Sequence, residues 1–235
     1  MTVPAPVASY KLSNTTDDMA TYTLTNNGVV TFVAGLVGNC ANCVRASSQY
    51  LSNASNLGIT TGNISLMAWI NVAALPTSAG DIWGIVNKGD ATSNIQYSLY
   101  LYNEGGTQKV VFNRQIQSVR NDELKYTASL STSAWHHIVG TYDGTNSRLY
   151  VDGALVAGPT AFSGTGGSAG VSVLQVGRSE SRLSGSYFNG KIDIAAVWNT
   201  VLSAADVTDL YSSGAGLEYP FTITTSNSAF LGAGI

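Results

Sequence analysis

The fold is decided by residues 135–156, which read WHHIVGTYDGTNSRLYVDGALV. Apolar and polar residues alternate in 136–142 and again in 148–151, and a period of two indicates strands with one buried side and one solvent-facing side. Asp152-Gly153 separates the second strand from the apolar residues 154–156. Because both residues of this pair tolerate the positive φ of a type I′ turn, the stretch predicts an antiparallel β-hairpin.

The same alternation recurs along most of the chain, for example in residues 66–72 (LMAWINV) and 95–102 (IQYSLYLY). Turn sequences separate these runs, among them NNG at 26–28, KGD at 88–90 and EGG at 104–106. Glycine and asparagine favour such turns because they adopt a positive φ at little cost. The pattern predicts many short antiparallel strands.

A single helix is predicted near residues 203–213. Ser203 and Asp206 form an S-x-x-D capping box, and Gly214 is well placed to end the helix. The apolar face of this helix would consist of Val207, Leu210 and Tyr211. Closely spaced strands with one late helix predict an all-β antiparallel sandwich and not a βαβ protein.

The composition fits one large domain and excludes one class of partner. The chain has 235 residues, of which 44% are hydrophobic and only 11% charged, with a net charge of −3. Nucleic-acid binding needs clustered cations, and no such cluster is present in the sequence. The start of the chain, MTVPAP at 1–6, has neither the basic start nor the apolar run of a signal peptide, and no window resembles a membrane span.

Cys40 and Cys43 form a C-x-x-C motif. A zinc site would need further ligands, and the only histidines, His136 and His137, are adjacent to each other. In an extended segment, residues three apart point to opposite faces, which disfavours a disulfide. We therefore expect both cysteines to be small packing residues.

Four groups of residues, taken together in their order and spacing along the chain, carry a resemblance to a known family. They are VGN at 37–39 with SSQYL at 47–51; LMAWI at 66–70 with IVNKGD at 85–90; WHHIVGTYDG at 135–144 with LYVDG at 149–153; and FNGKID at 188–193 with VWN at 197–199 and LSAA at 202–205. Together they resemble the laminin G-like (concanavalin A-like lectin/glucanase) superfamily over about residues 9–216. The resemblance implies a jelly roll of two antiparallel sheets. We accordingly divide the chain into an N-terminal arm (1–9), a sandwich domain (10–216) and a C-terminal tail (217–235).

Some relatives in this superfamily are glycoside hydrolases, which carry acidic residues in an E-x-D-x-x-E pattern on one strand face. The chain has four glutamates, Glu104, Glu123, Glu180 and Glu218, and none fits that pattern. Asp122 and Glu123 are neighbours and would point to opposite sides of a strand. The same holds for His136 and His137, and no Ser–His–acid spacing is recognisable. We predict that the protein is not an enzyme.

The resemblance also implies a structural calcium site on the edge of the sandwich. In many relatives the Asp of the G-x-I-D segment, here Asp193, binds calcium together with carbonyl groups of the V-G-N turn, here Gly38 and Asn39. An acid on the first strand completes that site, and this chain has Ser13 there. Asp193 is therefore expected either to hold calcium with a weakened ligand set or to cap a turn.

Aromatic side chains on an exposed sheet face can stack on sugar rings. Tyr100 and Tyr102 share one strand face, opposite Leu99 and Leu101, so leucines in the core would place the tyrosines on the outer or concave surface. Further ligand-binding candidates are Trp83, Tyr126 and Tyr187. For each of these aromatic residues the alternative is ordinary packing.

Two functions follow from the resemblance. The first is a non-catalytic, lectin-like binding or adhesion module that recognises a glycan or a cell surface and is displayed on a larger assembly. The alternative is a structural virion protein, such as a phage decoration, capsid or fibre protein. Both predict an extracellular or virion-surface location and neighbouring protein subunits, as in a homo-oligomer. A hydrolase remains a third function, which the carboxylates disfavour.

The tail carries a prediction of its own. No residue after Glu218 is charged, and residues 221–225 and 229–231 are apolar or β-prone. An exposed apolar strand tends to find a partner. We expect 219–235 to add to a sheet edge of a neighbouring subunit; the alternative is that it folds back on its own domain.

Overall fold

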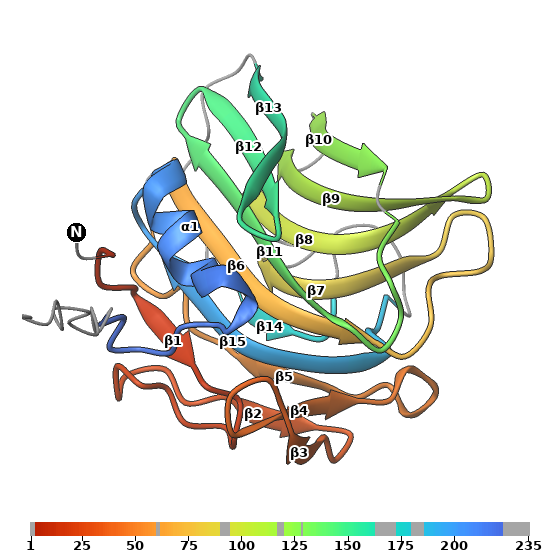
Figure 1. Cartoon of the computed structure of the whole chain (residues 1–235), viewed down its shortest axis with the longest axis vertical. Helices are drawn as coiled ribbons and strands as arrows, with labels where there is room; N and C mark the ends of the chain where they lie inside the picture. Colours follow the sequence, from red (N-terminus) through yellow and green to blue (C-terminus); the bar gives the residue numbers. More distant parts are fainter. Residues whose placement is uncertain are drawn as a thin grey trace, which may run out of the picture.

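The computed structural model describes residues 3–59, 62–89, 95–116, 120–127, 129–162, 173–179 and 186–222. Two antiparallel sheets pack face to face (Figure 1). The larger sheet runs, in spatial order, β13 (Ala154–Ala161), β12 (Asn146–Val151), β11 (Trp135–Asp143), β6 (Asn63–Val72), β15 (Gly190–Trp198), β4 (Asn39–Cys43) and β3 (Thr31–Ala34), and β1 (Ala8–Tyr10) pairs with β15 as its eighth strand. The seven-stranded sheet runs β10 (Arg120–Thr127), β9 (Thr107–Ile116), β8 (Ile95–Glu104), β7 (Ile82–Lys88), β14 (Leu174–Val176), β5 (Tyr50–Asn53) and β2 (Thr25–Asn27). The predicted all-β, two-sheet antiparallel sandwich is confirmed.

The main core lies between the two sheets. Leu66 and Ile70 point into it from β6, and Leu99 and Leu101 point into it from β8. None of these four side chains is more than 2% exposed. Successive side chains do point to opposite faces, but β6 is buried on both, since Met67 and Trp69 lie in a second apolar cluster. The expected solvent-facing side of 66–72 is therefore wrong.

The hairpin of β12 and β13 has the predicted turn. Asp152 and Gly153 have φ angles of 50° and 78°, as a type I′ turn requires. The backbone N–H of Asp152 donates to the carbonyl of His137, 2.8 Å away, which ties the turn to β11. A Cβ on Gly153 would lie 2.8 Å from the ring of Tyr211, so this position needs glycine for space as well as for φ.

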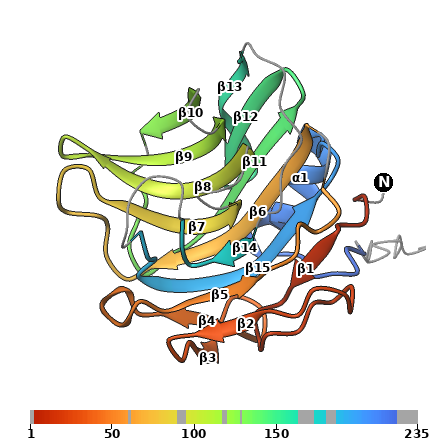
Figure 2. The ribbon, with the colours of Figure 1, turned by 180° about the vertical axis from the view of Figure 1, so that it is seen from behind.

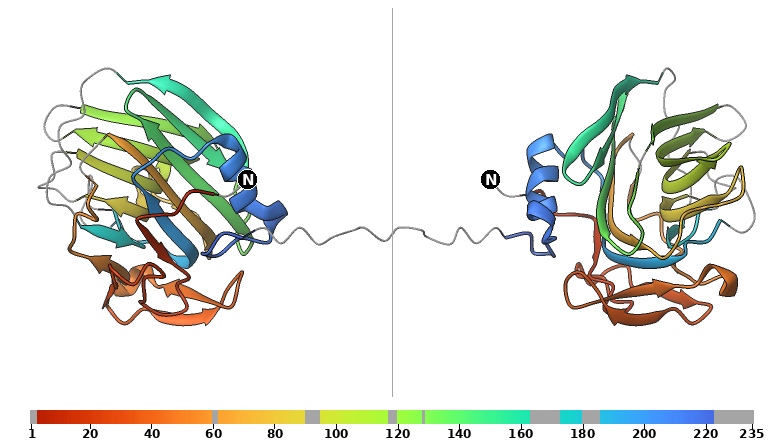
Figure 3. Two further views of the ribbon diagram at one scale, coloured as in Figure 1. Left: turned by 90° about the vertical axis from the view of Figure 1, so that its left-hand side faces the viewer. Right: turned by 45° about the vertical axis from the view of Figure 1, so that its right-hand side comes forward.

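A second apolar layer covers the outside of the eight-stranded sheet. Helix α1 (Ala204–Tyr211) lies on this face (Figure 3, right) and packs Val207 and Leu210 against Met67, Trp69 and Trp198. The Ser203–Asp206 capping box is present in full. The helix ends earlier than predicted, because Ser212, with a φ of 48°, takes the left-handed C-cap position that we assigned to Gly214. A 3-10 turn (Ser212–Gly214) follows.

Both ends of the described chain join this second layer. On the N-terminal side Val3 is buried, and the carbonyl of Pro4 accepts a 2.8 Å hydrogen bond from the indole N–H of Trp198. On the C-terminal side the ring of Phe221 stacks on Trp198, with ring centroids 5.8 Å apart. Val3 and Pro4 therefore pack against the sandwich, and the division into arm, sandwich domain and tail stays a prediction. Residues 219–222 fold back on their own domain, which was the alternative expectation; residues 223–235 lie outside the described part of the chain.

Cys40 and Cys43 are both free and buried. Cys43 lies in the core between the sheets, whereas the Sγ of Cys40 lies 3.7 Å from the carbonyl oxygen of Ala34. Burial raises the pKa of Cys40 to about 11 and that of Cys43 to about 12, so both thiols stay protonated at neutral pH. These properties are those of packing residues.

Candidate functional site

The seven-stranded sheet turns one face away from the core, and two rows of side chains cross it (Figure 2 shows its strands from behind). Strand register defines a polar row of Glu123, Asn113, Ser98, Asn87 and Gln175. It defines a second row of Lys125, Val111, Tyr100 and Gly84 beside the first. We call this face of the sheet the outer seven-strand face; within its two rows only Glu123 and Lys125 are partly exposed, and the other residues are buried.

Part of this face is covered by the backbone that follows β14. A Cβ on Gly84 would lie 2.1 Å from the nitrogen of Ser179 and 2.2 Å from the carbonyl carbon of Arg178. Residue 84 must therefore be glycine for the backbone of Arg178 and Ser179 to lie directly on β7. An isolated antiparallel bridge joins Arg178 to Tyr187, so the same crossing delivers both side chains to the face.

An aromatic–cationic group results from this arrangement. The rings of Tyr50, on β5, and Tyr187 have centroids 5.9 Å apart. The guanidinium carbon of Arg178 lies 4.8 Å from the centroid of Tyr50 and 5.4 Å from that of Tyr187. All three residues are partly exposed. We call these residues the Tyr50–Arg178–Tyr187 group.

The other predicted aromatic residues lie in two different places. Tyr102 is on the outer seven-strand face, partly exposed, with the Nζ of Lys125 5.2 Å from its ring centroid. Tyr100 is on the same face but fully buried, and its hydroxyl donates to Glu123 at 2.7 Å. Trp83 is 6% exposed within the main core, and Tyr126 packs against that core. Trp83, Tyr100 and Tyr126 therefore do not contribute to an open binding surface.

Sequence reasoning missed Tyr50, although its alternation with the buried Leu51 offered a signal. It also missed Asn113, which is 1% exposed in the polar row. Neither polar atom of its amide has a hydrogen-bond partner within the described residues. The neighbouring polar residues are hydrogen-bonded: the hydroxyl of Ser98 donates to the amide oxygen of Asn87, and its Oγ lies 3.2 Å from the Oγ of Ser179. A buried amide without a partner costs about 1–3 kcal/mol, so Asn113 would gain from a water or a ligand.

Two carboxylates come together on this face, which the sequence analysis did not anticipate. Glu104 and Glu123 both bind the ammonium group of Lys125, at 2.6 and 3.0 Å. The hydrogen bond from Lys125 is the largest cause of a lowered pKa for Glu104. Asp122, as predicted, points to the other side of β10, where it pairs with Arg114 at 2.8 Å.

Asp193 is completely buried, and its carboxylate is surrounded by hydrogen-bond donors. Its Oδ2 accepts from the backbone N–H groups of Leu36 and Val37, and its Oδ1 from that of Ile194. The carbonyl of Gly38 is itself bonded to the N–H of Gly35. Calcium needs six to eight oxygen ligands, whereas donors fill this site, so these residues do not fit the ion. They fit the alternative reading, in which Asp193 caps the turn before Gly38 and Asn39.

Among the described residues, no group of three or more His, Cys, Asp or Glu side chains could hold a metal ion. Burial raises the pKa of Asp193 to about 6, even though the three N–H donors lower it. Burial therefore disfavours the charged form of Asp193, and the three backbone N–H groups offset part of that effect by bonding to the carboxylate.

His136 lies between an acid and a serine, an arrangement that sequence spacing did not reveal. Its Nδ1 is 2.9 Å from Asp152 Oδ2, and its Nε2 is 3.2 Å from Ser131 Oγ. The hydrogen bond to Asp152 is the main cause of a raised His136 pKa. The same Nε2 lies 3.3 Å from the carbonyl oxygen of Ser131, which can only accept. A protonated Nε2 that donates to a carbonyl cannot take a proton from serine, so this is a structural link and not a nucleophilic triad.

The family model for the concanavalin A-like lectin/glucanases superfamily matches residues 45–208. The chain belongs to this superfamily. The matched range contains both sheets' central strands, the hairpin β12–β13 and most of helix α1. No curated protein matches the sequence of this superfamily member.

Solved structures share its fold at low sequence identity. Domain 4 of AbnA, a GH43 extracellular arabinanase from Geobacillus stearothermophilus solved with arabinotriose, is 18% identical with a TM-score of 0.67, and the match covers 87% of this chain and 97% of that one. The binding domain of Paraclostridial Mosquitocidal Protein 1 is 15% identical with a TM-score of 0.70, covering 89% and 52%. The binding domain of Botulinum Neurotoxin DC, solved with SialylT, is 13% identical with a TM-score of 0.65, covering 88% and 51%. The chain thus spans about half the length of the toxin binding domains.

In the described part of the chain, helices are too short or too polar to cross a membrane.

Proposed function

We propose that this chain is a non-catalytic, lectin-like module that binds a glycan on the outer seven-strand face. The observation that carries the proposal is the Tyr50–Arg178–Tyr187 group, in which two partly exposed rings flank a guanidinium group. Tyrosine rings stack on the C–H face of a sugar, and the guanidinium and phenol groups offer hydrogen bonds to its hydroxyls. Tyr102 would extend the aromatic surface along the same face.

The solved relatives support the ligand class. The arabinanase domain was captured with arabinotriose and a toxin binding domain with SialylT. Both are carbohydrate ligands of proteins with this fold. Because fold does not imply function, the argument for this chain still depends on its own side chains.

The absence of catalysis is part of the proposal, and it is supported by the pair Glu104 and Glu123. A retaining glycosidase needs two carboxyl groups about 5–5.5 Å apart, one of which is protonated. Here Lys125 binds both carboxylates, and its hydrogen bond lowers the pKa of Glu104. Glu104 is therefore not suited to act as a general acid.

The setting of the module belongs to the proposal as well. We place it outside the cell or on a virion surface, displayed on a larger assembly with neighbouring subunits. The alternative, a structural virion protein, stays a prediction. Light scattering coupled to gel filtration measures the oligomer that both functions predict, and glycan binding separates the two functions, because a purely structural protein needs no glycan ligand.

A glycan array with the purified protein and matched variants tests the proposal. Tyr50→Ala and Tyr187→Ala should abolish binding to at least one class of glycan that the wild type binds, since the stacking surface of the outer seven-strand face is lost. Tyr50→Phe and Tyr187→Phe should keep most of it, since the rings remain. An array without any ligand, or alanine variants that bind like the wild type, would refute this site.

A further inference from the structure

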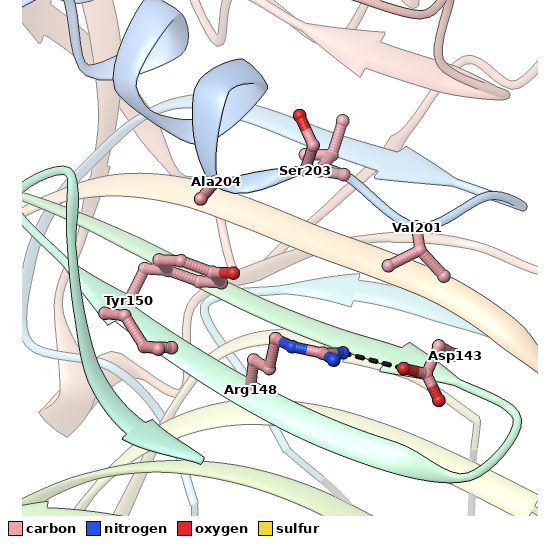
Figure 4. A pocket seen from close by; sticks show the side chains of 8 residues that line it. Asp143, Arg148, Tyr150, Val201, Ser203 and Ala204 are labelled. Carbon is pink, nitrogen blue, oxygen red and sulfur yellow. Dashed lines mark hydrogen bonds and ion pairs between the residues drawn. The ribbon is translucent and has the colours of Figure 1, made fainter. Parts of the chain in front are cut away.

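A pocket lies on the opposite side of the molecule, between the hairpin β12–β13 and the start of helix α1 (Figure 4). Its volume is about 490 Å³, within the range of small-molecule sites. The residues that matter for its chemistry are Asp143, Arg148, Tyr150, Leu155, Val201 and Ala204. None of them belongs to the outer seven-strand face.

One side of the pocket offers hydrogen-bond donors. The Nη1 of Arg148 donates to Asp143 Oδ2 at 2.7 Å, while Asp143 Oδ1 accepts from the backbone N–H groups of Thr145 and Asn146. Asp143 is therefore fully engaged, whereas the other N–H groups of Arg148 have no partner among the described residues. They can bond to a ligand without breaking the ion pair.

Tyr150 is the second polar group. It is only 3% exposed, yet its hydroxyl has no hydrogen-bond partner within the described residues. Figure 4 shows this hydroxyl pointing along the pocket, between Arg148 and the segment of Val201 to Ala204. The hydroxyl oxygen itself is not among the buried atoms that lack a partner, so it is open to the pocket and can bond to a molecule there.

The other side of the pocket is apolar and uncharged. Leu155 is 47% exposed, and Val201 and Ala204 also line the pocket. The first turn of α1 is already occupied by the capping box of Ser203 and Asp206, whose carboxylate would repel an anion. Since the positive charge of Arg148 and the negative charge of Asp143 cancel each other, the lining of the pocket carries no net charge.

We propose that this pocket binds one ring of a neutral sugar. The hydroxyl edge of the ring would meet Arg148 and Tyr150, and its C–H face would lie against Leu155, Val201 and Ala204. A ligand with a row of hydroxyls on one edge and C–H groups on its face matches this division, whereas an acidic sugar finds no net positive charge. The inference shares the glycan class with the proposed function but rests on different residues, so the module would have two separate binding sites.

Nuclear magnetic resonance titration of the ¹⁵N-labelled full chain tests the inference. The probes are the methyl glycosides of glucose, galactose, mannose and arabinose, with glucuronic acid as the charged counterpart. At least one neutral glycoside should shift the amide signals of residues 148–150 and 201–204. Tyr150→Phe should weaken that binding about fivefold to tenfold, the effect of one lost hydrogen bond. Arg148→Gln should weaken it to a similar extent.

The controls are Tyr211→Phe and Arg45→Gln, which change the same residue types outside the pocket and should leave the affinity unchanged. Shifts that persist unchanged in Tyr150→Phe, stronger binding of glucuronic acid than of every neutral glycoside, or no shift with any probe would each overturn the inference. Tyr50→Ala separates the two sites. It should leave the pocket shifts intact. Pocket shifts in a protein whose array binding is unchanged by Tyr50→Ala and Tyr187→Ala would refute the site on the outer seven-strand face alone.

Discussion

His137 lies beneath helix α1, with its ring centroid 5.0 Å from that of Trp69 and 6.0 Å from that of Tyr211. It is fully buried, and neither ring nitrogen has a partner within the described residues. Burial therefore lowers the pKa of His137 to about 3. Its neighbour His136 has a raised pKa because of Asp152, so adjacent histidines respond to acid in opposite senses.

The sign of the His137 effect can be tested by melting the protein as a function of pH. The unfolded chain binds a proton at His137 below about pH 6.5 and the folded chain does not, so stability should fall on acidification by up to about 1.4 kcal/mol per pH unit. His137→Phe keeps a ring but cannot be protonated, and its melting temperature should fall less between about pH 6.5 and pH 4. His136→Gln is the control and should lose a stabilisation that is present at mildly acidic pH. Equal acid sensitivity of wild type and His137→Phe would contradict the assignment.

Asp193 gives a second test at the level of single residues. Because backbone N–H groups hold its carboxylate, a chelator should leave the melting temperature unchanged. Asp193→Asn should lower stability by about 1–3 kcal/mol, since an amide NH₂ would face an N–H donor. Thermal melts with and without chelator, and with added calcium, measure both effects. Stabilisation by calcium that is lost in Asp193→Asn would show that the ion binds after all.

At the level of elements, the crossing of Arg178 and Ser179 over β7 depends on Gly84. Gly84→Ala places a methyl group 2.1 Å from the backbone of Ser179, so the crossing segment must move away from the sheet. We expect a lower melting temperature and loss of glycan binding, because Arg178 and Tyr187 would no longer lie beside Tyr50. Gly62→Ala is the matched control, since its Cβ would meet nothing closer than 3.6 Å. Crystal structures or array binding of both variants check this, and an unaffected Gly84→Ala would refute the role of the crossing.

The sequence predicts the strands and the helix better than it predicts the residues of the candidate binding site. The hairpin at Asp152-Gly153 and the helix that begins after Ser203 are encoded by neighbouring residues, so periodicity and capping chemistry suffice. The position of Tyr187 depends on its bridge to Arg178 in the crossing segment, and the direction of Trp83 depends on a strand with a register irregularity between Gly84 and Val86. No local pattern reveals either. Likewise Ser131, His136 and Asp152 meet only because β11 and β12 pair. Local signals therefore predicted the strands but not the composition of the site.

For the whole molecule, the outer apolar layer should contribute substantially to stability. Phe221 is 7% exposed and stacks on Trp198, so Phe221→Ala should lower the free energy of unfolding by about 3 kcal/mol. Val29→Ala, at a side chain that is 77% exposed, is the control and should change it by less than about 0.5 kcal/mol. Urea denaturation measures both. Equal stability of the two variants would mean that the segment 219–222 detaches in solution.

The pairing of β1 with β15 has a consequence for biosynthesis. Ala8, Ser9 and Tyr10 leave the ribosome long before their partners, Ala195 to Val197, are made. The strand next to them cannot be completed in the growing chain, and long-range pairing of this kind folds slowly. Until translation passes Trp198, the nascent polypeptide exposes the apolar strands of an unfinished sheet, and such strands are prone to aggregation.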